Sequence, residues 1–177
     1  MSTSLLLSLH RKSREKKYRL FLQLIRPLPE TRILNVGVAG VHSGLADQFE
    51  SFYPYHERIT GGGISPVDVG DYRRSFPRAN ALLLDGCALP FPDRSFDVVF
   101  SNAVIEHLPD RESQRRFAEE VQRVGRGWFV TTPNVWYPVE PHYHLPLVQF
   151  LPQAWQRVTG CRVTFYAETL VAFRAPS

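Results

Sequence analysis

Residues that could bind a ligand follow directly after several apolar segments of this sequence. In NVGVAG, Gly37 and Gly40 would let the backbone approach a ligand where a helix begins, and a helix N-terminus favours anionic groups. Asp85 follows a later segment in LLLDGCALP, and Ser101 and Asn102 begin SNAVIEHL after another. One glycine-rich turn alone is a weak signal, so the repeated placement of such residues is what indicates a binding site.

The stretch ITGGGIS, residues 59–65, places three glycines after β-branched residues. We expect the chain to leave a strand and turn here with almost no side chain present. The run raises the question of what it makes room for, and of what residue it has replaced.

The elements that would position these residues alternate in type. Short apolar segments predict strands, and segments with apolar residues at helical spacing predict helices. The predicted strands are 32–37, 56–60, 80–85, 95–102 and 127–134, and the predicted helices are 44–52, 68–76 and 111–125 with Gly125 as C-cap. Such alternation favours a parallel sheet covered on both faces, in a doubly wound Rossmann-like domain that binds ligands at the carboxyl ends of its strands.

Charge is concentrated near the N-terminus. The chain has 177 residues, 44% of them hydrophobic, and a net charge of +4. Residues 10–19 hold six Lys or Arg and one Glu, and Tyr18, Phe21, Leu22 and Ile25 behind them predict an amphipathic helix over 11–26 that ends before Pro27. Its basic face is either solvated or contacts an anionic surface, membrane or nucleic acid.

Other compositional features bound the class of protein. No apolar run reaches the roughly 18 residues of a membrane span. Cys87 and Cys161 do not make a disulfide framework. We therefore expect one soluble, cytoplasmic domain.

The succession ILNVGVAG, ITGGGISP and LLLDGCALPFPDRSFDVVFSNAVIEHL closely resembles the class I S-adenosylmethionine-dependent methyltransferases of the broad type 11, small-molecule group. The resemblance covers residues 32–134, and 132–152 are similar to the segment after the fifth strand in a bacterial subset. It implies a mostly parallel seven-stranded sheet with helices on both faces and a C-terminal antiparallel hairpin in CRVTFYAETLVAFRAPS. It also implies three parts: an N-terminal helix in 1–30, a cofactor-binding core in 31–134, and a substrate-side loop with the hairpin in 135–177.

The resemblance assigns S-adenosylmethionine to positions after the strands. In the family an acid-x-Gly-x-Gly pattern after the first strand holds the methionine end, and an acid after the second strand accepts from the ribose hydroxyls. The corresponding residues here are Asn35, Gly37, Ala39 and Gly40 for the first pattern, and Gly63 for the ribose acid. The resemblance further places Asp85 on the adenine amino group, Gly86, Cys87 and Ala88 near the ring, and Ser101 and Asn102 beneath the sulfonium.

Three of these positions depart from the family pattern: Asn35 replaces an acid, Ala39 a glycine and Gly63 the ribose acid. A charge-assisted hydrogen bond contributes about 1.5 to 3 kcal/mol, so loss of the ribose acid would weaken binding by about one to two orders of magnitude. Asp68 and Asp71 follow closely and are candidate replacements.

Methyl transfer needs in-line placement of a nucleophile and, for a hydroxyl, a base. His107, His142 and His144 are the candidates, with His107 and His142 preferred, although a histidine at 107 could equally cap or pack a helix. Glu140 with His142 and His144 supplies too few ligands for a metal, and we expect no metal site.

The aromatic, proline-rich stretch 134–155 is interpreted either as an apolar lid over the substrate or as a cover for the sheet edge. The sequence thus predicts a methyltransferase for a small molecule, apolar or lipid-linked in one hypothesis, with no nucleic acid bound. The alternative is a non-catalytic relative or partner subunit with an eroded cofactor site, and a homo- or hetero-oligomer is compatible with either. A NAD-dependent dehydrogenase is disfavoured because Gly-x-Gly-x-x-Gly and the acid after the second strand are absent.

Overall fold

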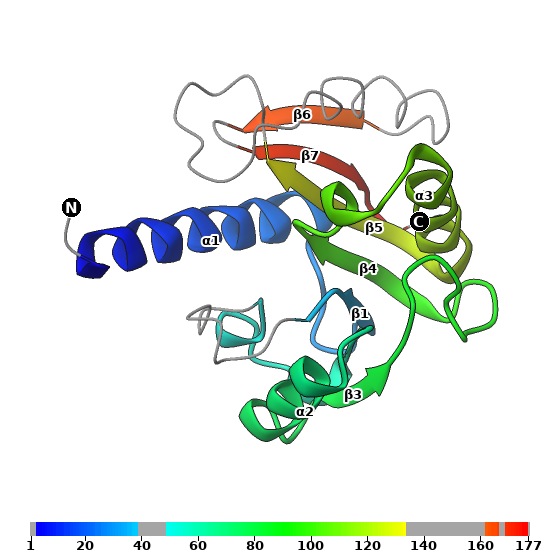
Figure 1. Cartoon of the computed structure of the whole chain (residues 1–177), viewed down its shortest axis with the longest axis horizontal. Coiled ribbons are helices and arrows are strands. Elements are labelled where there is room, and N and C mark those ends of the chain that lie inside the picture. Colours follow the sequence, from blue (N-terminus) through cyan, green and yellow to red (C-terminus); the bar gives the residue numbers. More distant parts are fainter. Residues whose placement is uncertain (1–2, 39–48, 134–161, 167–168, 177) are drawn as a thin grey trace.

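The computed structural model describes residues 3–38, 49–133, 162–166 and 169–176. They form a seven-stranded sheet in the order β3-β2-β1-β4-β5-β7-β6, drawn in Figure 1. The strands are β1 (Ile33–Val36), β2 (Ile59–Gly63), β3 (Asn80–Leu83), β4 (Phe96–Asn102), β5 (Gly125–Pro133), β6 (Arg162–Tyr166) and β7 (Thr169–Arg174).

The first five strands are parallel, whereas β7 lies antiparallel between β5 and β6. The order reverses at β1, from which the chain proceeds to β2 and β3 on one side and to β4 and β5 on the other. The predicted fold class, a doubly wound Rossmann-like sheet with a C-terminal antiparallel hairpin, is confirmed. The reversal beside β1 is where a ligand is expected in such a sheet.

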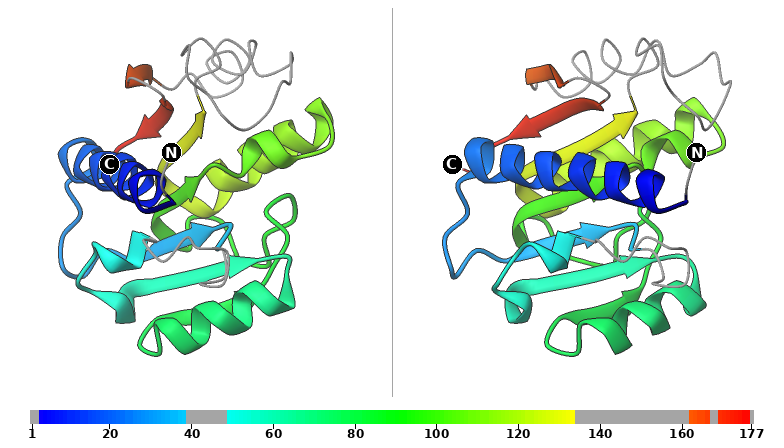
Figure 2. Two further views of the ribbon diagram at one scale, coloured as in Figure 1. Left: turned by 60° about the vertical axis from the view of Figure 1, so that its left-hand side comes forward. Right: turned by 90° about the vertical axis from the view of Figure 1, so that its left-hand side faces the viewer.

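Helices cover both faces of the sheet. The α-helices are α1 (Thr3–Ile25), α2 (Pro66–Ser75) and α3 (Arg111–Val124), and the short 3-10 helices are η2 (Phe49–Ser51), η3 (His56–Arg58) and η4 (Ile105–His107). Residues of α1, η2 and α2 pack into one apolar cluster, and those of α3 pack into a second with the opposite face of the same strands. Figure 2 shows α1 and α3 on opposite sides of the sheet.

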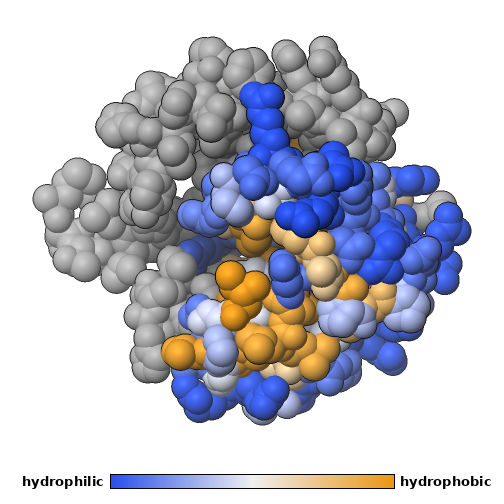
Figure 3. Space-filling view, turned by 45° about the vertical axis from the view of Figure 1, so that its right-hand side comes forward, coloured by the Kyte–Doolittle hydropathy of each residue, from blue (hydrophilic) through white to orange (hydrophobic). Residues whose placement is uncertain are grey.

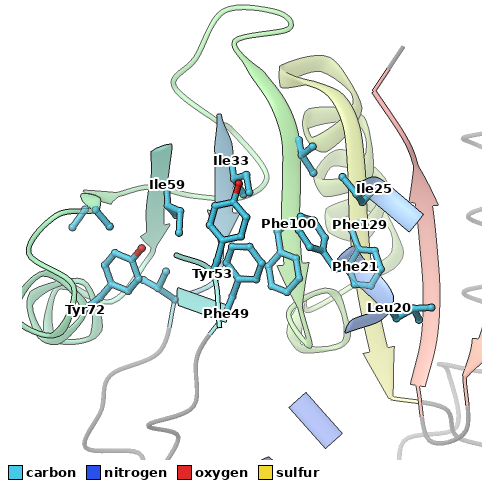
Figure 4. Close-up of a cluster of buried hydrophobic side chains, with 14 of the residues drawn as sticks. Leu20, Phe21, Ile25, Ile33, Phe49, Tyr53, Ile59, Tyr72, Phe100 and Phe129 are labelled. Atoms are coloured by element: carbon cyan, nitrogen blue, oxygen red, sulfur yellow. The ribbon is translucent and has the colours of Figure 1, made fainter. Parts of the chain in front are cut away.

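Aromatic side chains hold α1 and η2 against the sheet. Phe21 meets Phe49, Phe100 and Phe129 edge-on at centroid distances of 5.2, 5.6 and 5.5 Å, as the close-up in Figure 4 shows. Phe49 also stacks on Phe100 at 4.3 Å. Burial of such large rings is the main favourable contribution to packing at this face.

The helix predicted over 11–26 exists but begins at Thr3. Its buried face includes Leu20, Phe21 and Ile25, whereas Leu22 is exposed. The expectation that Leu22 belongs to the buried face was wrong, because the side of the helix that packs against the sheet is the one that carries Leu20, Phe21 and Ile25. The helix ends before Pro27, with Arg26 at a φ of +53°.

The predicted turn at the glycines is also wrong, because residues 61–63 lie within β2. They pair with β1 on one side and with β3 on the other. The turn comes later, where Ser65 caps α2 by accepting a hydrogen bond from the Asp68 N–H at 3.2 Å. Residues 56–58, predicted as strand, form η3 instead.

The remaining boundaries differ by only a few residues. Residues 49–51 of the predicted helix 44–52 form η2, and the rest of that prediction lies outside the described residues. Asp110 caps α3 by accepting from the Ser113 N–H, and Gly125 follows the helix as predicted, although with an extended φ of −102°. None of the described helices is long and apolar enough to cross a membrane.

Candidate functional site

A cavity of about 440 Å³ lies at the carboxyl ends of β1, β2 and β4. The strand ends contribute Asn35, Gly37, Gly63 and Asn102 to its lining, and His107 adds a side chain from η4. Rossmann-like sheets bind ligands at this position because strands on either side of the switch in order leave a crevice there. The cavity therefore brings together five of the residues predicted to bind cofactor or to act as base.

The turn after β1 requires glycine. Gly37 has a φ of +94°, and a Cβ at this position would overlap the side chain of Val104. The N–H groups of Gly37 and Val38 both donate to the carbonyl of Gly62, at 2.8 and 3.2 Å. The backbone thus crosses from β1 onto the end of β2 without any side chain between them.

The three glycines of β2 differ in what a side chain at each position would contact. A Cβ on Gly61 would overlap the ring of Tyr72, and one on Gly62 would overlap the side chain of Leu84. The three atoms nearest to a Cβ on Gly63 all belong to Val38 and lie at ordinary contact distances of 3.4 Å or more. The run therefore makes room for Tyr72 and Leu84, whereas Gly63, at which the resemblance predicts the ribose acid, has space for a Cβ.

Asn35 is part of a buried polar network that the sequence did not reveal. Its Nδ2 donates to Glu50 Oε1 at 2.7 Å, and the hydroxyl of Tyr72 donates to the same oxygen at 2.9 Å. Glu50 is 1% exposed, and its Oε2 has no hydrogen-bond partner among the described residues. Burial raises the pKa of Glu50, while the hydrogen bonds from Asn35 and Tyr72 act in the opposite direction.

No sequence pattern marked Glu50. It lies between aromatic residues in DQFESF, where a glutamate is ordinarily interpreted as a surface residue. Only the packing of η2 against β1 and α2 places its carboxylate between Asn35 and Tyr72.

The residues after β4 divide into structural and cavity-lining groups. Ser101 is fully buried, and its hydroxyl donates to the Val36 carbonyl at 3.0 Å, so it ties β4 to β1 and does not line the cavity. Asn102 lines the cavity and accepts from the Thr131 hydroxyl at 2.7 Å. Ala103, also at the cavity, has a φ of +57°, a left-handed conformation that alanine rarely adopts.

The turn at 85–88 lies outside the cavity. Asp85 is exposed, its Oδ1 accepts from the Cys87 N–H at 2.8 Å, and its carbonyl accepts from the Ala88 N–H at 3.1 Å. Asp85, Gly86, Cys87 and Ala88 are thus placed together, but none of them lines the cavity. Burial raises the pKa of the Cys87 thiol, and the neighbouring Asp85 carboxylate adds to this.

The segment that follows this turn is fixed by α3. The Arg123 guanidinium donates to the carbonyls of Phe91 and Leu89 at 2.7 and 3.0 Å, and Glu120 accepts from the Leu89 N–H at 2.7 Å. Arg123 also forms ion pairs with Glu120 and with Asp93. These contacts give the LPFPD segment a structural role in the second apolar cluster.

The two candidate replacements for the ribose acid are placed differently. Asp68 lines the cavity, on the first turn of α2. Asp71 is buried, forms an ion pair with Arg74 and does not line the cavity. Of the two, only Asp68 is in position to meet a ligand there.

The N-terminal helix contributes residues that were not predicted for the site. Arg14, Lys17 and Tyr18 line the cavity opposite the strand ends. Tyr18 stacks on Phe52 at a centroid distance of 5.5 Å, and Phe52 lines the cavity too. Only the basic character of residues 10–19 hinted at this, and it was interpreted as an outer surface.

Several predicted site residues lie outside the described part of the chain, namely Ala39, Gly40, Glu140, His142, His144 and the aromatic stretch at 134–155. Among the residues that the structure describes, no group of three or more His, Cys, Asp or Glu side chains could hold a metal ion.

The chain is similar to several curated proteins that are named as methyltransferases. A probable S-adenosylmethionine-dependent methyltransferase of Mycobacterium tuberculosis is 44% identical over 69 residues, which cover 37% of this chain and 24% of that protein. A 2-methyl-6-phytyl-1,4-hydroquinone methyltransferase of Synechocystis sp. is 29% identical over 155 residues, covering 81% of this chain and 46% of that protein. The chain thus spans about a quarter to about a half of the length of these curated relatives.

The fold has close structural counterparts. A solved protein of Pyrococcus horikoshii OT3 aligns with a TM-score of 0.66 at 15% identity, over 94% of this chain and 91% of that one. At such low identity the likeness shows the fold alone. A family model described as a methyltransferase domain matches residues 36–130, more than half of the chain. The chain therefore belongs to the class I S-adenosylmethionine-dependent methyltransferases, whose cofactor is S-adenosylmethionine.

Proposed function

We propose that this protein binds S-adenosylmethionine in the cavity at the ends of β1, β2 and β4 and transfers its methyl group to a small, apolar or lipid-linked acceptor. The observation that carries the proposal is that Asn35, Gly37 and Gly63, from three different positions of the family pattern, line one cavity. The side-chain-free approach of Gly37 to β2 and the open position at Gly63 leave room for a nucleoside at this point.

Different residues of the cavity are assigned to different parts of the cofactor and the acceptor. The cofactor supplies an already activated methyl group, so the chain has to orient and desolvate the reactants. Asp68 and Asn35 both line the cavity. We assign Asp68 to accept from the ribose hydroxyls in place of the missing acid, and Asn35 to the amino-acid end of the cofactor. His107 is the described residue proposed to take a proton from a hydroxyl acceptor, and His142 stays a second candidate from the sequence.

The walls of the cavity support an apolar acceptor. Tyr18, Phe49, Phe52 and Phe100 all line it, and such aromatic surfaces bind apolar groups by excluding water. The Synechocystis relative is named for a hydroquinone with a phytyl chain, which is consistent with this class of acceptor.

Calorimetric titration with S-adenosylmethionine and S-adenosylhomocysteine, with NADH as a negative control, tests the proposal. We expect micromolar binding of both adenosyl compounds, and an Asp68→Asn variant that binds each about tenfold more weakly. An absence of binding up to millimolar concentration would instead favour the non-catalytic alternative, which the loss of acids at positions 35 and 63 supports.

The surface supports two further parts of the proposal. Lys16 and Arg19 lie on the exposed side of α1, where they could contact an anionic membrane, and flotation with anionic liposomes at low salt tests this.

Figure 3 shows an apolar area on one face, and the large exposed hydrophobic residues include Ile64, Val67 and Leu83. Light scattering would reveal an oligomer that buries such residues, and a monomer would count against one. A cytoplasmic location remains a prediction from the sequence.

A further inference from the structure

A buried carboxylate lies directly behind the cavity and is not used by the proposed mechanism. Glu50 is 1% exposed and is placed by η2, whose neighbouring Phe49 lines the cavity. Carboxylates are rarely buried without a compensating partner, because removal from water is costly. The partners of Glu50 therefore indicate what its burial achieves.

One of these partners is the residue that stands where the family has its acid. Asn35 donates from Nδ2 to Glu50 Oε1 at 2.7 Å, and Asn35 lines the cavity. An asparagine amide has a donor end and an acceptor end of nearly equal size, so its orientation is set by its neighbours. With Nδ2 held by the carboxylate, Oδ1 is the end that remains to accept from a ligand.

We propose that Asn35 and Glu50 act as a unit in place of the family's single acid, with Asn35 Oδ1 accepting from the ammonium of the cofactor's amino-acid end and Glu50 acting as its positioning residue. This inference rests on the proposed function. An amide turned the other way would present two N–H donors to the ammonium, so the orientation decides between attraction and repulsion. The buried carboxylate adds negative charge behind the amide, which also favours a cation in front of it.

The second partner of Glu50 provides a matched control. The Tyr72 hydroxyl donates to the same Oε1 at 2.9 Å, yet Tyr72 does not line the cavity. Tyr72→Phe removes one hydrogen bond from Glu50 and leaves Asn35 in place. If Glu50 were only structural, Tyr72→Phe would disturb binding as the loss of Glu50 does. If Glu50 positions Asn35, Tyr72→Phe would leave the orientation of Asn35 unchanged.

The test compares two probes by calorimetry: S-adenosylhomocysteine, and 5′-methylthioadenosine, which has the same nucleoside and sulfur but no amino-acid end. In Glu50→Leu the acceptor for Asn35 is gone, and we expect about tenfold weaker binding of S-adenosylhomocysteine with methylthioadenosine changed less than about twofold. Glu50→Gln keeps an acceptor oxygen and should retain most of the affinity. Tyr72→Phe should leave the ratio of the two affinities unchanged.

If Glu50→Leu does not fold, a double variant that exchanges the acid and the amide between positions 35 and 50 tests the same inference. Asn35→Asp combined with Glu50→Gln returns the acid to the family's position and should bind S-adenosylhomocysteine at least as tightly as the wild type.

The outcomes separate the inference from the proposed function. If wild type binds both probes equally, or if Glu50→Leu or the exchange variant weakens both probes alike, the role of Glu50 in positioning is overturned while nucleoside binding stands. If Tyr72→Phe changes the ratio as strongly as Glu50→Leu, Glu50 is structural only. If wild type binds neither probe, the inference and the proposed function both fall.

Discussion

The ends of β1 and β2 differ from the turn at 85–88 both in motif and in surroundings. Asn35 and Gly63 depart from the family pattern but line the cavity, whereas Asp85 to Ala88 follow the pattern and lie outside it. The segment that follows the family pattern continues into a loop that Arg123 and Glu120 hold against α3. A match to a motif therefore identified the fold correctly, while two of the altered positions, Asn35 and Gly63, line the cavity together with unaltered ones such as Gly37.

The largest effect is expected inside the glycine run. Gly61→Ala would push a Cβ into the Tyr72 ring and displace the hydroxyl that bonds Glu50, so we expect about 3 kcal/mol less stability. Gly63→Ala, where the new Cβ has ordinary contacts, should change the free energy of unfolding by less than about 0.5 kcal/mol. Urea unfolding measures both, and equal losses would contradict the distinction between the two glycines.

The second predicted effect is a dependence of stability on pH that comes from Glu50. Burial raises its folded-state pKa above the ordinary value of 4.5, so its contribution to stability is full below that pH and is lost as pH rises through the folded-state value. Glu50→Gln does not ionise and keeps an acceptor oxygen. We expect the free energy of unfolding of this variant to rise relative to that of the wild type as pH increases from 4 to 8, with the smallest difference near pH 4.

Urea unfolding across this pH range checks that expectation. Among the described residues, His56, whose Nε2 contacts the Glu50 carbonyl at 2.7 Å, and Tyr72 are the titratable groups that act on Glu50, and both are present in the two proteins. Glu57→Gln, the same substitution at a largely exposed position, is the matched control. A difference between Glu50→Gln and the wild type that does not grow with pH would contradict a raised pKa for Glu50.

The third predicted effect is a gain in affinity for S-adenosylhomocysteine. Gly63→Asp would place an acid at the position predicted for the family's ribose acid, where a Cβ has only ordinary contacts, and should tighten binding of S-adenosylhomocysteine about tenfold. Gly63→Asn, of the same size without the charge, is its control. Calorimetry gives both affinities, and an aspartate that binds no better than asparagine would show that Asp68 satisfies the ribose hydroxyls without a second acid.

The smallest effect is expected at the turn that follows the family pattern. The Asp85 carboxylate is exposed and already accepts from the Cys87 N–H, so Asp85→Ala should weaken binding of S-adenosylmethionine only about threefold. A loss of a hundredfold or more would place this turn in the binding site on equal terms with Asn35, and would reverse the comparison of the two regions.

Much of the fold followed from local patterns. The β-branched and apolar strands, the cap at Gly125, and the prolines after α1 are short-range signals that propensity and capping explain. The turn predicted at 59–65 failed because glycine is ordinarily a strand breaker. Here the absence of side chains at Gly61 and Gly62 is required by Tyr72 and Leu84, which lie 11 and 22 residues further along the chain.

The sequence by itself determined the alternation of elements, the family, and the departures at Asn35 and Gly63, because these depend on residue types in order along the chain. Only the tertiary structure decided that Glu50 lies against Asn35, that Arg14 and Lys17 of α1 line the cavity, and that Asp68 rather than Asp71 does so. These contacts join residues that are close only after helices pack on the sheet. Burial and hydrogen bonding then give a side chain an environment that its neighbours in sequence do not specify.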